Sequence, residues 1–296
     1  MRNSPRLDTE LKLPVVFPLT LVCLCLTGCD QEKIDTCEDA PPPLLEMPAE
    51  LGEEVLTLAE ISVDEWVEKS RDGKEDTGGM LAAYFADLTN LDEEKIPVVA
   101  FGEACVGEVG RHVIHESPRP LTAASVMFRG LMVGKRSLEK NDAGIFDVEI
   151  ISGSIFSEEG GENVEVEVES AGGADSFQNF VLKVTIPPEI RLVNLEHNSD
   201  WTLDVEWEPA DSSYFEITAT TVNDDPGLPK NRLKCLLEDD GCHVIPAEAM
   251  EWLLSQGSEE VTVILKRHVL AHDVPADGAL AEIDVIRSME NKLFME

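Results

Sequence analysis

The chain has 296 residues and a formal net charge of −36 at pH 7, from 59 acidic and 23 basic side chains. This charge excludes nucleic acid as an expected partner, because phosphate backbones need cationic side chains to neutralise them. Hydrophobic residues make up 43% of the sequence. That share supplies enough apolar surface for a packed core and excludes an acidic disordered chain.

The first 28 residues have the pattern of a secretory signal peptide. Basic residues precede an apolar stretch, 13–26, which contains two prolines and is too short to span about 30 Å of hydrocarbon. The stretch ends in Leu26-Thr27-Gly28-Cys29, which resembles the lipobox of bacterial lipoproteins. The resemblance implies cleavage before Cys29, acyl chains such as palmitate on its thiol, and a membrane-anchored protein in the periplasm or on the cell surface. The alternative is an ordinary secretory signal that happens to contain a cysteine.

The next segments predict a tether and a short region of weak helices. Residues 29–50 are polar and proline-rich, and Pro41-Pro42-Pro43 favours an extended spacer. Residues 51–95 carry weak helical signals. Ser62 with Glu65 forms a capping-box pattern, and 80–88 has the composition of a second short helix.

Beyond residue 95 the pattern is typical of β-strands. Val164, Val166 and Val168 alternate with glutamates, which predicts one buried and one solvated face. Glycine and asparagine turn signals separate further alternating segments, at 180–184, 203–207, 214–220, 261–269 and 281–289. We therefore expect a mainly β fold of two antiparallel β-sandwich, immunoglobulin-like modules with a few short helices. The expected domains are 96–186 and 187–296, with one helix at 246–256 that starts at Pro246.

Residues 187–218 resemble the first half of a fibronectin type III domain. The matching positions are Pro187 and Pro188 at the entry, the strand-end Trp207, Pro209, and the strand from Tyr214 to Ile217. The second half departs from that family, because the tyrosine-corner strand is missing and the helix at 246–256 interrupts it. The resemblance implies an immunoglobulin-like domain of uncertain strand order.

The whole layout also resembles uncharacterised lipoproteins of myxobacteria and their relatives. Their lipobox, tether and β-rich modules are followed in the C-terminal half by a tryptophan strand, a leucine-cysteine strand, an acidic turn and a helix start. The matching residues here are Val205, Trp207, Pro209, Leu233, Cys235, Asp240, Gly241 and Val244 to Ala247. This family has no established activity, so the likeness implies location and fold and no chemistry.

Four cysteines remain once the signal and Cys29 are set aside: Cys37, Cys105, Cys235 and Cys242. An even number in an exported chain predicts disulfides, and four cysteines allow three pairings. We favour Cys235–Cys242, because the Asp-Gly turn between them can bring them together, which leaves Cys37–Cys105. Free structural thiols are the alternative.

Acidic loops offer weak candidates for a calcium site. They contain Asp224 and Asp225 in one loop and Asp239 and Asp240 in another, and calcium prefers several oxygen ligands. Neither loop has EF-hand spacing, and solvated turns are the commoner explanation. No other cofactor is expected.

Histidines and tryptophans give little further indication of a site. His112 and His115, with Glu116, would point to opposite faces of a strand, which disfavours a shared metal. His243, His268 and His272 are expected on the surface or in loops. Trp201 and Trp207 are expected to pack at a strand end and in the core.

No catalytic motif of known type emerges. Ser137 to Lys140 has the serine–lysine spacing of penicillin-interacting enzymes, but the partner motifs of that family are missing from the sequence. We therefore expect a lipid-anchored, non-enzymatic protein with a binding or structural role, whose partners are the membrane and an envelope protein or glycan. The alternative is a cell-envelope hydrolase with an unrecognised site.

Overall fold

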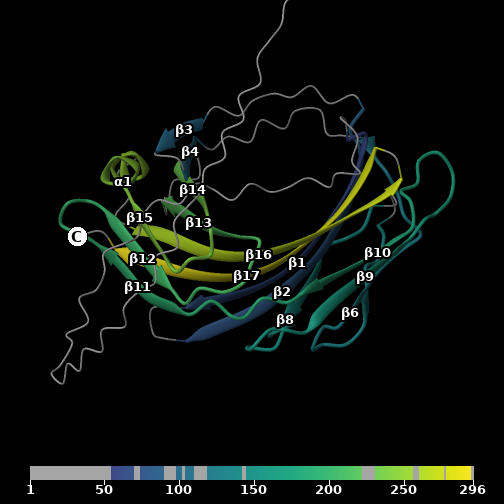
Figure 1. The fold of residues 1–296 in the computed structure, drawn as a ribbon, viewed down its shortest axis with the longest axis horizontal. Helices are drawn as coiled ribbons and strands as arrows, with labels where there is room; N and C mark the ends of the chain where they lie inside the picture. The colour runs from purple at the N-terminus through teal and green to yellow at the C-terminus, as the bar shows by residue number, and fades with distance from the viewer. Residues whose placement is uncertain are drawn as a thin grey trace, which may run out of the picture. The chain divides into compact units, whose positions relative to one another are not determined.

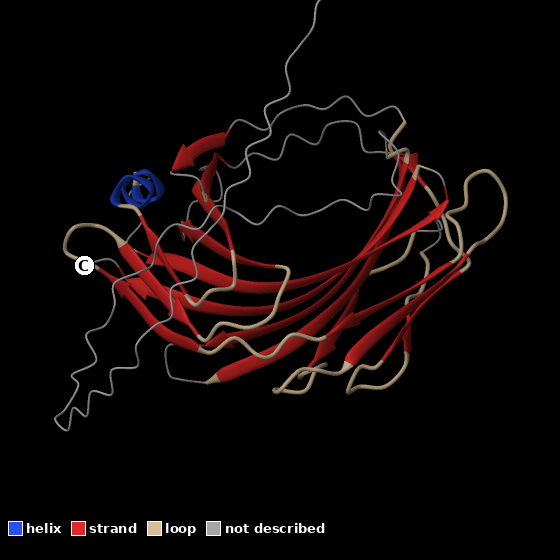
Figure 2. Ribbon diagram, in the orientation of Figure 1, coloured by secondary structure: helices blue, strands red, loops and turns tan. Residues whose placement is uncertain are grey.

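The structure, a computed structural model, describes residues 55–69, 74–89, 98–101, 104–109, 119–141, 145–221, 231–255, 260–276 and 278–294. These residues form seventeen strands and one helix (Figure 2), so the expected mainly β class is confirmed. They all belong to one compact unit. Within them, no helix has the length and apolar character needed to cross a membrane.

The strands form three sheets (Figure 1), and every pairing of named strands is antiparallel except β1 with β17. The largest sheet has ten strands. In sheet order these are β3 (Val98–Phe101), β4 (Cys105–Val109), β14 (Asn231–Leu237), β13 (Tyr214–Thr221), β16 (Glu260–Ala276), β17 (Ala279–Phe294), β1 (Thr57–Lys69), β2 (Glu75–Asp87) and β5 (Arg119–Pro120), with β8 (Glu149–Ser152) also beside β2.

Two smaller sheets complete the β structure. The four-stranded sheet has the order β10 (Phe180–Thr185), β9 (Asn163–Glu169), β6 (Ser125–Arg129) and β7 (Arg136–Ser137). The three-stranded sheet has the order β11 (Leu192–His197), β12 (Leu203–Trp207) and β15 (Cys242–Ile245). The described helix, α1 (Ala247–Leu254), follows β15 and lies within the expected range 246–256, but Pro246 is its extended N-cap and not its first helical residue.

Buried side chains gather in two hydrophobic cores. The first core takes residues from β1, β2, β6, β9, β10 and the first half of β17. The second takes residues from β4, β12, β13, β14, α1 and the first half of β16. The predicted alternation is confirmed, since Val164, Val166 and Val168 are all buried. The long strands β16 and β17 contribute to both cores, so the expected ranges 96–186 and 187–296 do not form self-contained units.

The helices expected within 51–95 are wrong, because the described part of this region forms β1 and β2. Ala59, Ile61 and Val63 alternate into the first core with a period of two. The expected capping residue Glu65 is instead a buried strand residue. Gly79 lies inside β2. A glycine suits this position, because the side chain of Ile155 fills the space that a β-carbon would need.

The favoured disulfide pairing is also wrong. The structure forms Cys105–Cys235, because the antiparallel register of β4 and β14 sets these two residues directly opposite each other. Cys242 is disulfide-bonded as well, while Cys37 lies outside the described residues. His243 is buried beside the bridge, with Nε2 3.4 Å from Cys105 Sγ. These three residues are close enough for a shared metal, but sulfurs bonded to each other are not the thiolates that a metal binds.

Candidate functional site

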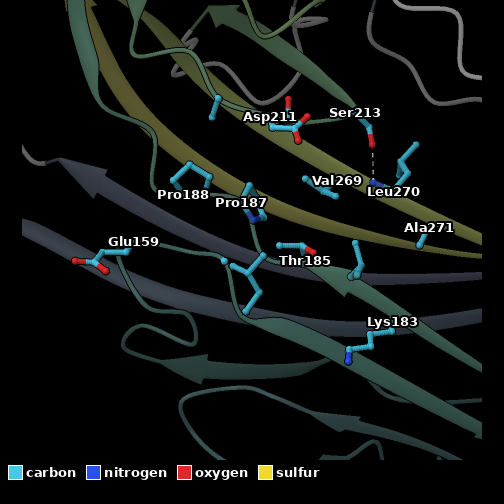
Figure 3. Close-up of a pocket in the computed structure, with 15 residues that line it drawn as sticks. Glu159, Lys183, Thr185, Pro187, Pro188, Asp211, Ser213, Val269, Leu270 and Ala271 are labelled. Atoms are coloured by element: carbon cyan, nitrogen blue, oxygen red, sulfur yellow. Dashed lines mark hydrogen bonds between the residues drawn. The ribbon is translucent and has the colours of Figure 1, made fainter.

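A cleft of about 570 Å³ lies where β10 passes β16, beside the first core. One wall is the end of β10 with Pro187 and Pro188, and the other is the loop 210–213. Figure 3 shows Asp211 and Ser213 on one side and Thr185 on the other, with Val269 between them. The volume falls within the range of about 300–1,000 Å³ that is typical of ligand-binding pockets.

Two strand edges lie open at this cleft. β10 is the terminal strand of its sheet. The pairing of β16 with β13 stops at His268, whereas its pairing with β17 continues to Ala276. In the described part of the chain, the segment 269–276 therefore has a strand neighbour on one side only. Unpaired backbone groups on such edges are available to pair with an added strand. On 269–276, however, the N–H groups of Leu270 and Val274 already donate to the side chains of Ser213 and Asp273.

The lining combines an apolar floor with charged rims. Val269 and Ala271 pack against the first core, while Glu159, Lys183 and Asp211 stand around the opening (Figure 3). These three charged side chains form no ion pair or side-chain hydrogen bond with any described residue. They are thus available to a ligand that presents both apolar and charged groups.

A buried arginine fixes the wall of the cleft. Arg267 is 1% exposed, and its guanidinium donates to the carbonyl oxygens of Pro188, at 3.0 Å, and Glu208, at 2.6 Å. Asp239 neutralises it, with Oδ2 2.6 Å from Nε. Asp239 Oδ1 also accepts from the Trp207 indole N–H at 2.7 Å. The register places Arg287 opposite Arg267.

Arg287 has its own acid on the strand beside it. Its Nη1 lies 3.5 Å from Oε1 of the buried Glu65. The other Glu65 oxygen accepts from the backbone N–H groups of Ile155 at 2.6 Å and Phe156 at 2.9 Å. Burial lowers the pKa of Arg287, while Glu65 acts to raise it. The boundary between the cores thus carries two arginines, each paired with one carboxylate.

The cleft has no catalytic arrangement among the residues that line it. A hydrolytic serine needs a base within hydrogen-bond reach. Ser213 Oγ instead accepts from the backbone N–H of Leu270 at 2.9 Å, and the described lining includes neither histidine nor cysteine. The arrangement can bind and orient a ligand, but it offers no activated nucleophile.

The opposite face of the large sheet carries a histidine–carboxylate pair that the sequence did not indicate. His268, expected at the surface, is buried, with Nδ1 2.8 Å from Asp284 Oδ2 and its ring stacked on Tyr214. Its Nε2 is buried and has no hydrogen-bond partner in the described structure. The nearby Ser288 hydroxyl donates to Asp64. No described hydroxyl reaches His268, so the pair lacks the nucleophile of a hydrolase.

Two lysines hold a buried glutamate on this same face. Glu216 lies 2.8 Å from Lys234 and 3.1 Å from Lys266. Burial alone would raise the pKa of Glu216, but the hydrogen bond from Lys234 and the charges of both lysines outweigh it, so the pKa falls to about 2. Asp64 behaves oppositely, since burial raises its pKa despite the hydrogen bond from Ser288.

The calcium candidates are not supported where they are described. Asp239 is engaged by Arg267 and Trp207, so its oxygens already have cationic and N–H partners. Asp240 Oδ1 accepts from the N–H of Cys242 within the turn. Asp224 and Asp225 lie outside the described residues.

Some of the remaining sequence-predicted residues lie outside the described structure. His112, His115 and Glu116 lie outside the described residues, as does Cys29. Lys140 contacts the backbone oxygen of Ala123 and the hydroxyl of Thr122, and no contact joins it to Ser137. The core position of Trp207 is confirmed, at 2% exposed and stacked on Phe215. Trp201 lies just before β12 and its ring contacts that of His197, while 47% of its side chain stays exposed.

Comparison with known proteins adds little to this geometry. No protein-family model matches the chain, and no curated protein matches it. A matching solved structure is described as structural insight into host cell surface retention of a 1.5-MDa bacterial ice-binding adhesin. It is 10% identical with a TM-score of 0.21, and the match covers 87% of this chain and 65% of that one. This chain therefore spans slightly less than two thirds of the matched chain, and so low a TM-score carries no argument.

Proposed function

We propose that this protein is a lipid-anchored extracytoplasmic binding protein that accepts an extended polypeptide segment in the cleft beside β10 and β16. The anchor half of the proposal rests on the signal-like first 28 residues and the lipobox-like Leu26 to Cys29. Two or three acyl chains on Cys29 would hold the protein firmly, since each buried methylene contributes about 0.8 kcal/mol.

The observation that supports peptide binding is the pair of open strand edges at the cleft. A peptide in extended conformation can satisfy its backbone groups on such an edge, and alternate side chains then enter the adjoining pocket. Val269 and Ala271 would contact its apolar side chains. Lys183 and Asp211 would contact charged ones.

A cleft-filling variant tests the binding half. We would select extended twelve-residue peptides from a display library on the full-length protein in detergent and measure their affinities by calorimetry. Ala271→Trp places an indole in the cleft and should weaken binding by about tenfold or more, because a lost contact of 1.4 kcal/mol already gives tenfold. Ile150→Trp adds the same ring at a 72% exposed position on β8 and should bind as the wild type does.

Two results would contradict this half. One is a library that yields no binders, and the other is equal affinity for wild type and Ala271→Trp when both have the same circular dichroism spectrum. The anchor half is tested separately by mass spectrometry of the N-terminal peptide. An unmodified Cys29, or a mature N-terminus elsewhere, would rule out the lipid anchor without affecting the cleft.

A further inference from the structure

The hairpin between β11 and β12 holds a tryptophan at its tip in a closely bonded turn. Asn198 N–H donates to the Thr202 carbonyl at 2.8 Å, and Trp201 N–H donates to the Asn198 carbonyl at 3.0 Å. Asp200 Oδ1 accepts from both the N–H and the hydroxyl of Thr202, at 3.2 and 2.7 Å. The turn therefore has one well-defined conformation.

That conformation is unfavourable for a tryptophan. Trp201 has φ of +71°, and it is the non-glycine residue with positive φ in the described chain. A bulky side chain in this region costs free energy, because its β-carbon crowds the backbone. Trp201 recovers little by packing, since almost half of it stays exposed. A residue that is both strained and exposed is a reason to look for a ligand.

The surroundings of the ring are aromatic and negative. The His197 ring lies edge-on to Trp201, with centroids 5.5 Å apart at 76°. Hydrogen bonds from Thr202 lower the pKa of Asp200, which keeps this neighbouring carboxylate ionised. Between 192 and 207 the sequence has four acidic residues and no lysine or arginine. The hairpin therefore combines an exposed indole with an excess of acidic over basic side chains in its sequence.

We propose that this hairpin binds cationic side chains, lysine or arginine, of a basic polypeptide partner. Tryptophan is the side chain that attracts a cation to its face most strongly. The acidic residues raise the local concentration of cations, whereas a neutral sugar would gain nothing from them. The turn is already ordered, so little conformational freedom is lost on binding. This site is separate from the cleft and goes beyond the function proposed for it.

A glycine substitution separates binding from stability. Trp201→Gly removes the ring but suits the positive φ, so the variant should melt at the same temperature as the wild type or higher. A capped hexa-arginine peptide, measured by calorimetry on the full-length protein at constant ionic strength, should bind Trp201→Gly about threefold or more weakly. Val193→Ser, at a 63% exposed site on β11, should bind as the wild type does and so corrects for the general attraction of the acidic chain.

A second variant tests the charge. Asp200→Asn retains an oxygen that accepts from Thr202 but loses the charge, so it should also weaken hexa-arginine binding. Equal affinity of wild type and Trp201→Gly would overturn the proposal. So would Trp201-dependent binding of neutral N-acetylglucosamine hexasaccharide at the affinity of hexa-arginine. Neither probe nor variant involves a cleft residue, so failure here would leave the peptide cleft unaffected.

Discussion

Replacing Asp239 by alanine should reveal how strongly the boundary between the two cores depends on charge pairing. Asp239 is the carboxylate that neutralises Arg267, a guanidinium only 1% exposed. In the variant this cation stays buried, because its other donors remain bound to backbone carbonyls. Its cross-strand neighbour is Arg287, another cation. The variant therefore leaves an unpaired buried charge opposite a like charge.

The expected loss of unfolding free energy is about 3–5 kcal/mol, the cost of breaking a buried ion pair by removing one partner. The Trp207 indole N–H also loses its acceptor, which adds about 1–3 kcal/mol if water does not replace it. A total in this range is a large fraction of the stability of an ordinary domain, about 5–15 kcal/mol.

Urea denaturation followed by tryptophan fluorescence measures the effect, because urea, unlike guanidinium, does not screen charges. Asp147→Ala is the control, since Asp147 is exposed on a loop and should change stability by at most about 0.5 kcal/mol. The double variant Asp239→Ala/Arg267→Met lacks both charges. Its loss of unfolding free energy should therefore be about 2 kcal/mol smaller than the sum of the losses in the two single variants. Additive losses, or a loss below about 1 kcal/mol for Asp239→Ala, would refute the pairing argument.

Three further predictions concern the same fold. The Cys105→Ser/Cys235→Ser variant should lose about 2–5 kcal/mol of unfolding free energy, measured by urea denaturation, because the bridge closes a loop of 130 residues. An unchanged urea midpoint would contradict this prediction. The pKa of Glu216 is about 2, below its ordinary value of 4.5. Ionised Glu216 therefore contributes fully to the free energy of unfolding above about pH 4.5, and this contribution is lost as pH falls towards 2. Glu216→Gln should therefore be less stable than wild type at pH 7, with the gap closing at acid pH in urea titrations. Gly130 and Gly134 both have positive φ, but only at Gly130 would a β-carbon strike a backbone carbonyl, so Gly130→Ala should lower the melting temperature far more than Gly134→Ala.

The sequence predicts the fold class best where solvated and buried residues alternate cleanly. The valine–glutamate alternation of β9 identified a strand with one wet face, and the structure agrees. β1 and β2 were missed for specific reasons. Glu65 occupies a buried position, which breaks the apolar pattern of β1. The alanine-rich segment of β2 has no polar alternation, because Met80, Ala82 and Tyr84 occupy its less buried face.

The candidate site could not be predicted, because its parts come from distant segments. Lys183 and Ala271 meet only after β10 crosses β16, and no local motif encodes that crossing. The Asp239–Arg267 pair likewise joins residues 28 positions apart. The available signals were Arg267 and Arg287, which continue the alternation of buried residues in their strands, since a charge at a buried position needs a partner. The turn signal Asp240-Gly241 was real, but it connects β14 to β15 and not the two cysteines to each other.

The parallel pairing of β1 with β17 has a mechanical consequence if Cys29 is the anchor. Tension from the membrane would then enter the described structure near Thr57, at the start of β1. This strand lies beside β17 over twelve residue pairs and beside β2 over thirteen. A force along β1 would stretch all of these backbone hydrogen bonds together in shear, so the strand would not peel away one pair at a time. A tethered protein built in this way could stay folded while a bound partner pulls on it against the anchor.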